Sequence, residues 1–201
     1  MASKVGICNL ALSHLAHSEE IADFDNDESA TAQAARTYYE PIRLAMLRDF
    51  PWNFAKKIKA LAVQETDPNK LWAFSYRLPG DCVAVRRVVS GERVDTEETR
   101  IPFEVGEDDA GGLLFTDEEE AEIEYTFDQK KTERFSADFI VAFSHRLAWL
   151  MAPRVTGGDP NKLGPMNFQA YNLANLRAQG MSANEGQQDP PPDAEMIEAR
   201  D

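Results

Sequence analysis

The chain has 201 residues, of which 43% are hydrophobic, so it can bury one substantial core without disulfide or metal staples. Its formal net charge is −14 and its isoelectric point is near 4.6. This acidity argues against a surface that grips nucleic acid, because phosphate binding needs clustered Lys and Arg. No apolar run reaches membrane-spanning length and the first residues lack a signal-peptide pattern, so we expect neither a membrane span nor export.

The first half of the chain begins with two helices. Apolar residues recur in steps of three and four over residues 3–17, where Ser3 suits the N-cap. After a polar loop, the same period returns near Ser29 and runs to Phe50. Pro41 lies inside this second helix. Because an interior proline removes a backbone hydrogen bond and crowds the preceding turn, we expect a kink or break between residues 37 and 41.

Short strands follow from about residue 57. The clearest is marked by Ile123, Tyr125 and Phe127, which alternate with polar residues and so predict a half-buried antiparallel strand. Turn-forming pairs at 79–80, 90–91 and 111–112 separate such segments. The pattern predicts strands at residues 59–63, 73–78, 82–89, 100–105, 112–116 and 121–127.

Helical spacing returns at Ser136, which suits the N-cap of a third helix ending at residues 157–158, where two glycines stand. Pro165 suits the first turn of a fourth helix that runs to Gly180. Residues 181–201 are polar, acidic and proline-rich. They cannot bury enough apolar surface to offset their ordering entropy, so we expect an extended tail.

The order of these segments predicts an α+β fold: an antiparallel bundle of four main helices, an inserted small antiparallel β-subdomain and an extended C-terminal tail. The bundle would comprise residues 1–56 and 133–180, the insertion residues 57–132 and the tail residues 181–201. Large rings and a turn crowd the boundary between bundle and insertion. We expect a structural junction with mainly buried rings there, formed by Trp52, Phe54, Trp72, Tyr76, Pro79 and Asp81.

Candidate reactive groups are few. Alternate acidic residues at 23, 25 and 27 resemble the start of a calcium loop, but Glu28 and Ala34 stand where the loop needs Gly and a closing Glu. His14 and His17 share a helix face without a Cys or acidic partner at ligand spacing. Cys8 and Cys82 lack a nucleophile motif and metal-type spacing, which favours reduced, packed thiols. We therefore assign no catalytic, cofactor-binding or metal-binding residue.

Six motifs occur in a fixed order: Asn9-Leu10-Ala11-Leu12, Ile21 to Asp27, Tyr39 to Leu47, Trp52-x-Phe54-Ala55, Tyr76-x-Leu78-Pro79-x-Asp81-Cys82 and Phe139 to Ala148. In order and spacing they make the chain, up to about residue 180, resemble the head-to-tail adaptor proteins of tailed bacteriophages. That family includes the tail tubular protein A of short-tailed phages. The chain departs from it at Ala16-His17, where members often place Gly after the first helix, and at Pro41.

The resemblance implies a virion structural protein of the neck or tail, assembled in the host cytoplasm, with no enzymatic activity and no cofactor. It further implies a homo-oligomeric ring, usually of twelve copies, between the portal protein and a distal tail or nozzle protein. The helical part would face the portal and the β-part the tail. DNA would pass through such a ring without specific binding, and no membrane partner is implied.

Two hypotheses follow for the acidic and apolar residues. Acidic side chains of the β-part would face the channel or the tail interface, although composition alone favours a solvated acidic face: Glu107, Asp108, Asp109, Glu118, Glu119 and Glu120. Met196 and Ile197, the apolar handle of the tail, would dock on the portal. The alternatives are a small metal-dependent hydrolase using the Asp23–Asp27 loop, and an acidic nucleic-acid mimic that sequesters a basic partner.

Overall fold

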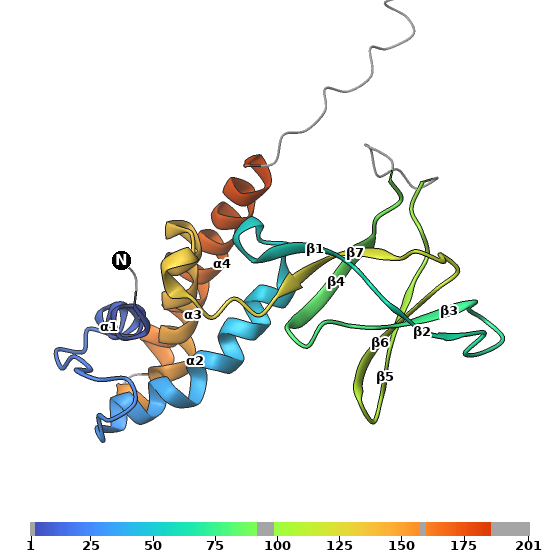
Figure 1. Ribbon diagram of the computed structural model, residues 1–201. Helices are drawn as coiled ribbons and strands as arrows, with labels where there is room; N and C mark the ends of the chain where they lie inside the picture. The colour runs from blue at the N-terminus through green and yellow to red at the C-terminus, as the bar shows by residue number, and fades with distance from the viewer. Residues whose placement is uncertain (1–2, 92–98, 157–159, 186–201) are drawn as a thin grey trace, which may run out of the picture.

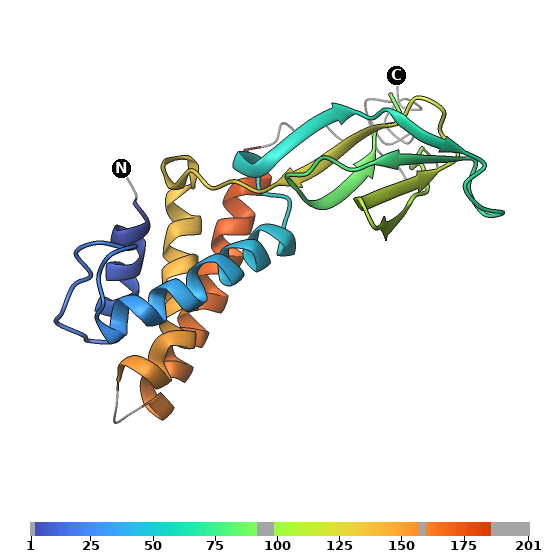
Figure 2. The same ribbon diagram turned by 60° about the horizontal axis from the view of Figure 1, so that its bottom comes forward.

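The computed structural model describes residues 3–91, 99–156 and 160–185. Within them the fold is α+β, as predicted, with four helices and two antiparallel sheets. Figures 1 and 2 show the helices on one side of the molecule and both sheets on the other. The helices are α1 (Lys4–His14), α2 (Ala30–Asp49), α3 (Ala137–Val155) and α4 (Pro160–Asn184).

Side-chain caps fix where three of these helices begin. Ser3 Oγ accepts from the backbone N–H of Gly6 at 3.0 Å, and Ser136 Oγ accepts from Phe139 at 3.3 Å, which confirms both predicted caps. Ser29 Oγ similarly accepts from a backbone N–H three residues on, at 3.2 Å. These short polar residues satisfy N–H groups that have no partner inside the helix.

The second helix continues through Pro41, so the expected break is wrong. Pro41 and Thr37, whose carbonyl loses its donor, are both exposed, which leaves that carbonyl open to water. Tyr39 and Ile42 are buried on the inner face. Packing of the inner face therefore holds the helix together across a defect on its outer side.

The last helix is longer than expected at both ends. It begins at Pro160, so Pro165 lies inside it rather than in its first turn, and it ends at Asn184 instead of Gly180. The first residues of the expected tail are thus helical. Asn53 explains the extension, because its side-chain amide donates to the carbonyl of Ser182 at 2.5 Å. The expected helix end at 157–158 and residues 186–201 of the tail lie outside the described residues.

The strands form two sheets, with the order β1-β7-β4 in one and β2-β3-β6-β5 in the other. All neighbours are antiparallel. The strand expected at 59–63 is in fact the end of one strand and the start of another, and that expected at 100–105 begins only at Glu104. The bounds are β1 (Lys56–Ala60), β2 (Val63–Thr66), β3 (Phe74–Arg77), β4 (Cys82–Val88), β5 (Glu104–Asp108), β6 (Gly111–Thr116) and β7 (Glu122–Phe127).

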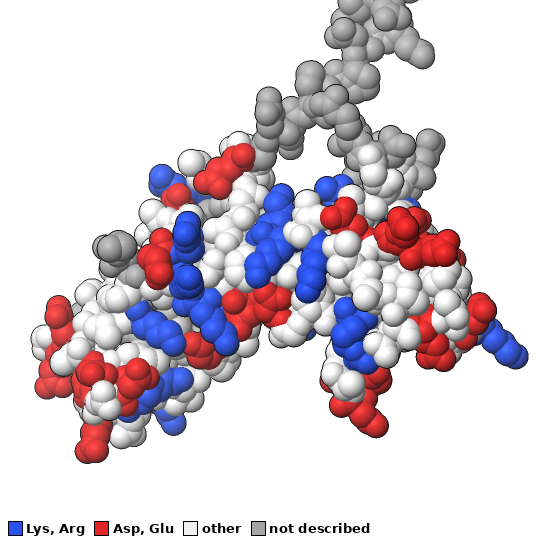
Figure 3. Space-filling model, in the orientation of Figure 1, with Lys and Arg blue, Asp and Glu red and all other residues white. Residues whose placement is uncertain are grey.

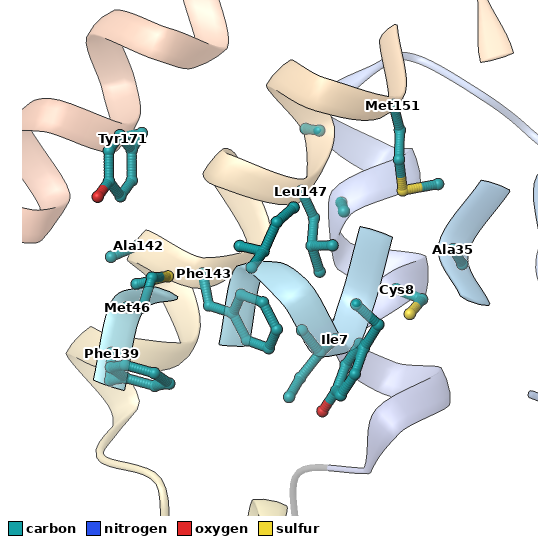
Figure 4. Close-up of a cluster of buried hydrophobic side chains, with 14 of the residues drawn as sticks. Ile7, Cys8, Ala35, Met46, Phe139, Ala142, Phe143, Leu147, Met151 and Tyr171 are labelled. Atoms are coloured by element: carbon teal, nitrogen blue, oxygen red, sulfur yellow. The ribbon is translucent and has the colours of Figure 1, made fainter. Parts of the chain in front are cut away.

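The described residues form two hydrophobic cores. The larger lies among the helices, where Met46, Phe139, Phe143 and Leu147 interlock (Figure 4). The smaller joins the sheets and consists of Tyr76, Val88, Leu114, Ala121, Ile123 and Tyr125. Phe127, at the end of β7, packs against both. The two cores therefore meet where the chain passes between helices and sheets.

Candidate functional site

Aromatic rings and ion pairs gather at the boundary between helices and sheets, and Trp52 lies at its helical side. Its ring is fully buried and lies 5.0 Å from both Phe50 and Phe139, measured between ring centroids. The indole Nε1 donates to the carbonyl of Met46 at 2.7 Å. Half-buried Phe54 stacks on the same ring at 5.9 Å. This cluster seals the helical core at the point where the chain leaves it.

Arg43 crosses the boundary from α2. Its side chain is 2% exposed, and its guanidinium lies 2.6 Å from Asp128 and 2.8 Å from Glu40. A further N–H donates to the carbonyl of Gln129 at 2.7 Å. Because Asp128 and Gln129 follow β7 directly, this buried cation fixes α2 to the segment that returns from the sheets.

Arg86 of β4 makes the reciprocal contact from the sheet side. Its Nη2 donates to the carbonyls of Leu47, Arg48 and Phe50 at 2.9 to 3.0 Å, while Nε donates to Thr126 Oγ1 at 2.8 Å. The last carbonyls of a helix have no partner inside it and attract cations. Arg86 thus caps the C-terminus of α2 with a residue from the first sheet.

Asp81 is the acidic member of the predicted junction. It accepts from Lys57 Nζ at 2.7 Å and from the hydroxyl of Tyr125 at 3.1 Å. Partial burial raises the pKa of Asp81, but these two hydrogen bonds outweigh it, so the net pKa lies below the usual value. Pro79 closes the turn before it, since its carbonyl accepts from the N–H of Cys82 at 2.9 Å. Both residues therefore anchor the beginning of β4.

The other two predicted junction residues belong to the sheets. Tyr76 is buried in the smaller core, and its hydroxyl lies 2.6 Å from the carbonyls of both Glu118 and Glu119. Half-buried Trp72 belongs to neither core and donates from Nε1 to Glu104 at 2.8 Å. It precedes β3 in a connection that Figures 1 and 2 place at the end of the sheets away from the helices. Trp72 therefore lies outside the boundary where it was expected.

Sequence reasoning missed the two arginines that cross the boundary. A signal existed for Arg43, because the steps Tyr39, Arg43 and Leu47 place a charge on the apolar stripe of α2. A charge in such a stripe is buried only with a partner. Arg86 gave no comparable signal, since its partners are carbonyls of a distant helix end.

The first group of acids lies at the tip of the β5–β6 hairpin. Asp108 receives two hydrogen bonds from Arg77, at 2.6 and 2.7 Å, and these bonds lower its pKa to about 2. Glu107 and Asp109 on either side are exposed. In Figure 3 this tip is red, whereas Lys and Arg gather nearer the middle of the same face.

The second group of acids, Glu118, Glu119 and Glu120, lies in the connection between β6 and β7 with exposed side chains. Two of them help to line an open groove of about 630 Å³ with Ala60, Leu61 and Val63. The hairpin tip and this connection are at opposite ends of β6, which at six residues spans about 20 Å. The structure therefore does not bring the six predicted acids together.

The Asp23–Asp27 loop directs its carboxylates at its own chain. Asp23 accepts from the backbone and side-chain N–H groups of Asn26 at 3.0 and 3.1 Å, and Asp27 accepts from the N–H of Ser29 at 2.8 Å. These hydrogen bonds lower the pKa of both aspartates. Arg36 binds two carbonyls of the loop. Among the described residues no group of three His, Cys, Asp or Glu could hold a metal ion.

The remaining candidates are thiols and imidazoles. Burial raises the pKa of Cys8 to about 12 and that of Cys82 to about 11, so both are protonated at neutral pH and weak nucleophiles. His14 stacks on His145 with ring centroids 3.8 Å apart and lies 3.1 Å from Ser144 Oγ. The histidine pair thus joins α1 to α3 inside the helical part.

Comparison of the chain with protein-family models and with curated proteins found no match. No helix in the described ranges is long and apolar enough to cross a membrane. Any functional assignment therefore depends on the junction, the acidic turns and the sequence motifs.

Proposed function

We propose that the chain is a head-to-tail adaptor of a tailed bacteriophage, a structural protein of the virion neck that forms a ring between the portal protein and the distal tail. In this proposal the four helices act as one antiparallel bundle, and residues 57–132 act as an inserted β-subdomain. The observation that carries the proposal is the boundary between the two cores, where Arg43 and Arg86 bind across it in both directions.

An adaptor needs two different surfaces held in a fixed relative orientation, because it meets one partner at each end. Charge-assisted hydrogen bonds to backbone carbonyls provide such fixation, since the guanidinium geometry is rigid and each bond is directional. Arg86 alone binds three carbonyls that end α2. The motif Trp52-x-Phe54-Ala55, which contributes to the resemblance, packs at this same boundary.

The acidic turns support passage of DNA without binding. Carboxylates at both ends of β6 would give a channel wall a negative potential over about 20 Å, which keeps phosphates from settling on it. The exposed lysines of β1, Lys56, Lys57 and Lys59, would trap DNA if they faced the channel. In the proposed ring they therefore face away from the channel.

The ring is tested by size-exclusion chromatography with light scattering, with and without the portal protein. We expect a ring-sized species when portal is present, because the portal can act as the template for the ring and its binding stabilises the assembled state. In the Arg43→Met variant the boundary between helices and sheets is damaged, so we expect less of the ring-sized species. Absence of a ring-sized species in both conditions would overturn the proposal, and electron cryomicroscopy of the assembled neck would give the orientation.

The channel wall is tested by charge reversal. A variant with Glu118, Glu119 and Glu120 all changed to Lys should retard linear DNA in a gel once assembled, whereas the original ring should not. A matched control also reverses three exposed acids, Glu19, Glu20 and Glu28 in the loop after α1. If both variants retard DNA equally, these turns do not face the passage.

Docking of the C-terminal segment on the portal is tested by truncation after Glu185, which leaves α4 whole. We expect weaker association with the portal, because Met196 and Ile197 are lost. A variant that changes only these two residues to Ser distinguishes side-chain docking from an effect of length. Unchanged assembly of the truncated chain would contradict this part of the proposal.

A further inference from the structure

The outward face of α4 has the spacing of a coiled-coil seam. This helix packs on α3 and turns Asn167, Tyr171 and Ala178 inward. On its opposite side the steps alternate between three and four residues, which is the pattern of core positions in a two-helix coiled coil. The residues of this seam are all exposed: Met166, Gln169, Leu173, Leu176, Gly180 and Ala183.

The seam is apolar where a solvated helix would be charged. Leu173, Leu176 and Met166 are 72%, 66% and 56% exposed. The chain as a whole is 28% charged, yet residues 163–184 contain a single charged residue, Arg177. That side chain lies 3.4 Å from Asp138 of α3. A helix face of this composition is typical of protein contact rather than of solvent exposure.

Gly180 supplies a second, independent observation. It lies within the helix, and a Cβ built on it would have no atom within 4 Å. Glycine inside a helix makes the helix less stable than alanine would. Because a Cβ at position 180 would meet no neighbouring atom of the same chain, the glycine brings no benefit within that chain. The missing side chain at this exposed seam position leaves a hole that a larger side chain of another helix could fill.

We infer that the seam pairs with the same seam of a second copy, with the two α4 helices antiparallel. Antiparallel pairing about a two-fold axis midway between Leu173 and Leu176 sets each large residue against a smaller or equal one. Leu173 then meets Leu176 of the second copy, Gln169 meets Gly180, and Met166 meets Ala183. Parallel pairing would instead set Gly180 against Gly180 and leave a gap at that layer.

The length of the seam determines how tight the pair should be. From Met166 to Ala183 it spans about 26 Å, at about 1.5 Å per residue. Such a strip buries roughly 500 Å² per copy, less than the roughly 800 Å² of a standard interface. The dimer should therefore depend on concentration. A two-fold contact pairs two copies and does not close a ring, so it needs neither portal nor tail protein.

The pairing is tested on the purified full chain alone, by sedimentation velocity at increasing concentration. We expect the mass to rise toward that of a dimer. Leu173→Asp and Gly180→Phe should each remain monomeric, while circular dichroism shows an unchanged fold. Leu71→Asp is the matched control, because Leu71 is 77% exposed on the far connection before β3 and should leave the dimer intact. A wild-type chain that stays monomeric throughout would overturn the inference.

Orientation is tested by cysteine cross-linking under mild oxidation. A mixture of Gln169→Cys and Gly180→Cys chains should form a disulfide between chains, whereas each variant alone and the wild-type chain should not. The reason is that residue 169 lies beside residue 180 of the partner only in the antiparallel pair. Cross-linking of Gln169→Cys with itself would indicate parallel pairing, and no cross-link in the mixture would indicate no such contact. Either result overturns the antiparallel seam.

Discussion

The guanidinium of Arg43 lies 2.6 Å from the carboxylate of Asp128, so a buried cation of α2 neutralises an anion just beyond the last strand. Changing Arg43→Met should lower the free energy of unfolding by about 3 kcal/mol, because Asp128 keeps only the exposed Lys130 at 3.4 Å and the carbonyl of Gln129 loses its buried donor. Urea denaturation measures this loss.

Two further variants separate the cause. Adding Asp128→Asn to Arg43→Met should recover part of the loss, since no unpaired charge remains. Lys4→Met removes an exposed pair with Glu40 and should cost less than about 1 kcal/mol. Equal losses in Arg43→Met and Lys4→Met would show that burial of the ion pair does not matter.

Arg86→Lys should destabilise the chain by about 2–3 kcal/mol, although the charge is kept. A single ammonium cannot reach the three carbonyls that end α2 together with Thr126 Oγ1. In a urea series, unfolding of the helices should be followed by circular dichroism and unfolding of the sheets by hydrogen exchange of the strand peptides, read by mass spectrometry, because Trp52 and Trp149 both belong to the helical part. We expect the two transitions to separate in the variant and to coincide in the original chain, because Arg86 links the helical core to the first sheet. Coincident transitions in both proteins would refute this.

Ala16→Gly should stabilise the chain by about 1 kcal/mol. Ala16 has a positive φ of 54° at the end of α1, and the N–H of His17 donates back to the carbonyl of Leu12 at 3.1 Å. This is the Schellman arrangement, in which the left-handed position favours glycine. Ala45→Gly, inside α2, is the control and should lower stability by about 1 kcal/mol. Thermal unfolding should shift in opposite directions for the two variants.

The free energy of unfolding should decrease as the pH is lowered from 6.5 to about 4, because of His14. Burial, with a smaller repulsion from His145, lowers its pKa from 6.5 to about 4. The unfolded chain therefore binds a proton in this range that the folded chain does not, so stability increases as pH rises through it and is complete above 6.5. After allowance for partial solvent exposure, the loss is roughly 1–2 kcal/mol.

His14→Gln isolates this contribution, because an amide keeps a hydrogen-bonding group without titrating. Its urea midpoint should be nearly independent of pH from about 5 to 6.5, where the aspartates with lowered pKa values do not yet protonate. Asp108, with a pKa of about 2, contributes stability that is lost only at lower pH. An unchanged slope in the variant would assign the pH dependence to another group.

The helices could be predicted because their signals are local. The caps at Ser3 and Ser136 and the apolar periods depend on residues within a few turns of one another. The division of one predicted strand between two sheets at residues 61–62 could not be predicted, because strand pairing is decided by distant partners. The same limit applies to Trp72, which was expected beside Trp52 at the boundary. Its position depends on how β3 pairs with distant strands, and it lies away from Trp52.

The acidic residues illustrate this limit at the candidate site. Glu107 and Glu118 are near neighbours along the chain, yet a complete strand separates their turns. Charge patterning indicates that both are exposed but contains no information about their separation. Arg86 is the converse case, since it lies far from α2 in sequence and caps that helix in space.

The two places where the chain passes between helices and sheets lie side by side, because Lys56 of β1 pairs with Thr126 of β7. Neighbouring strands are about 4.8 Å apart, so the chain leaves the helices and returns to them through a single rung of the first sheet. A slip of one residue in the register of this pair would turn the side chains of β1 to the opposite face and shift both passages together.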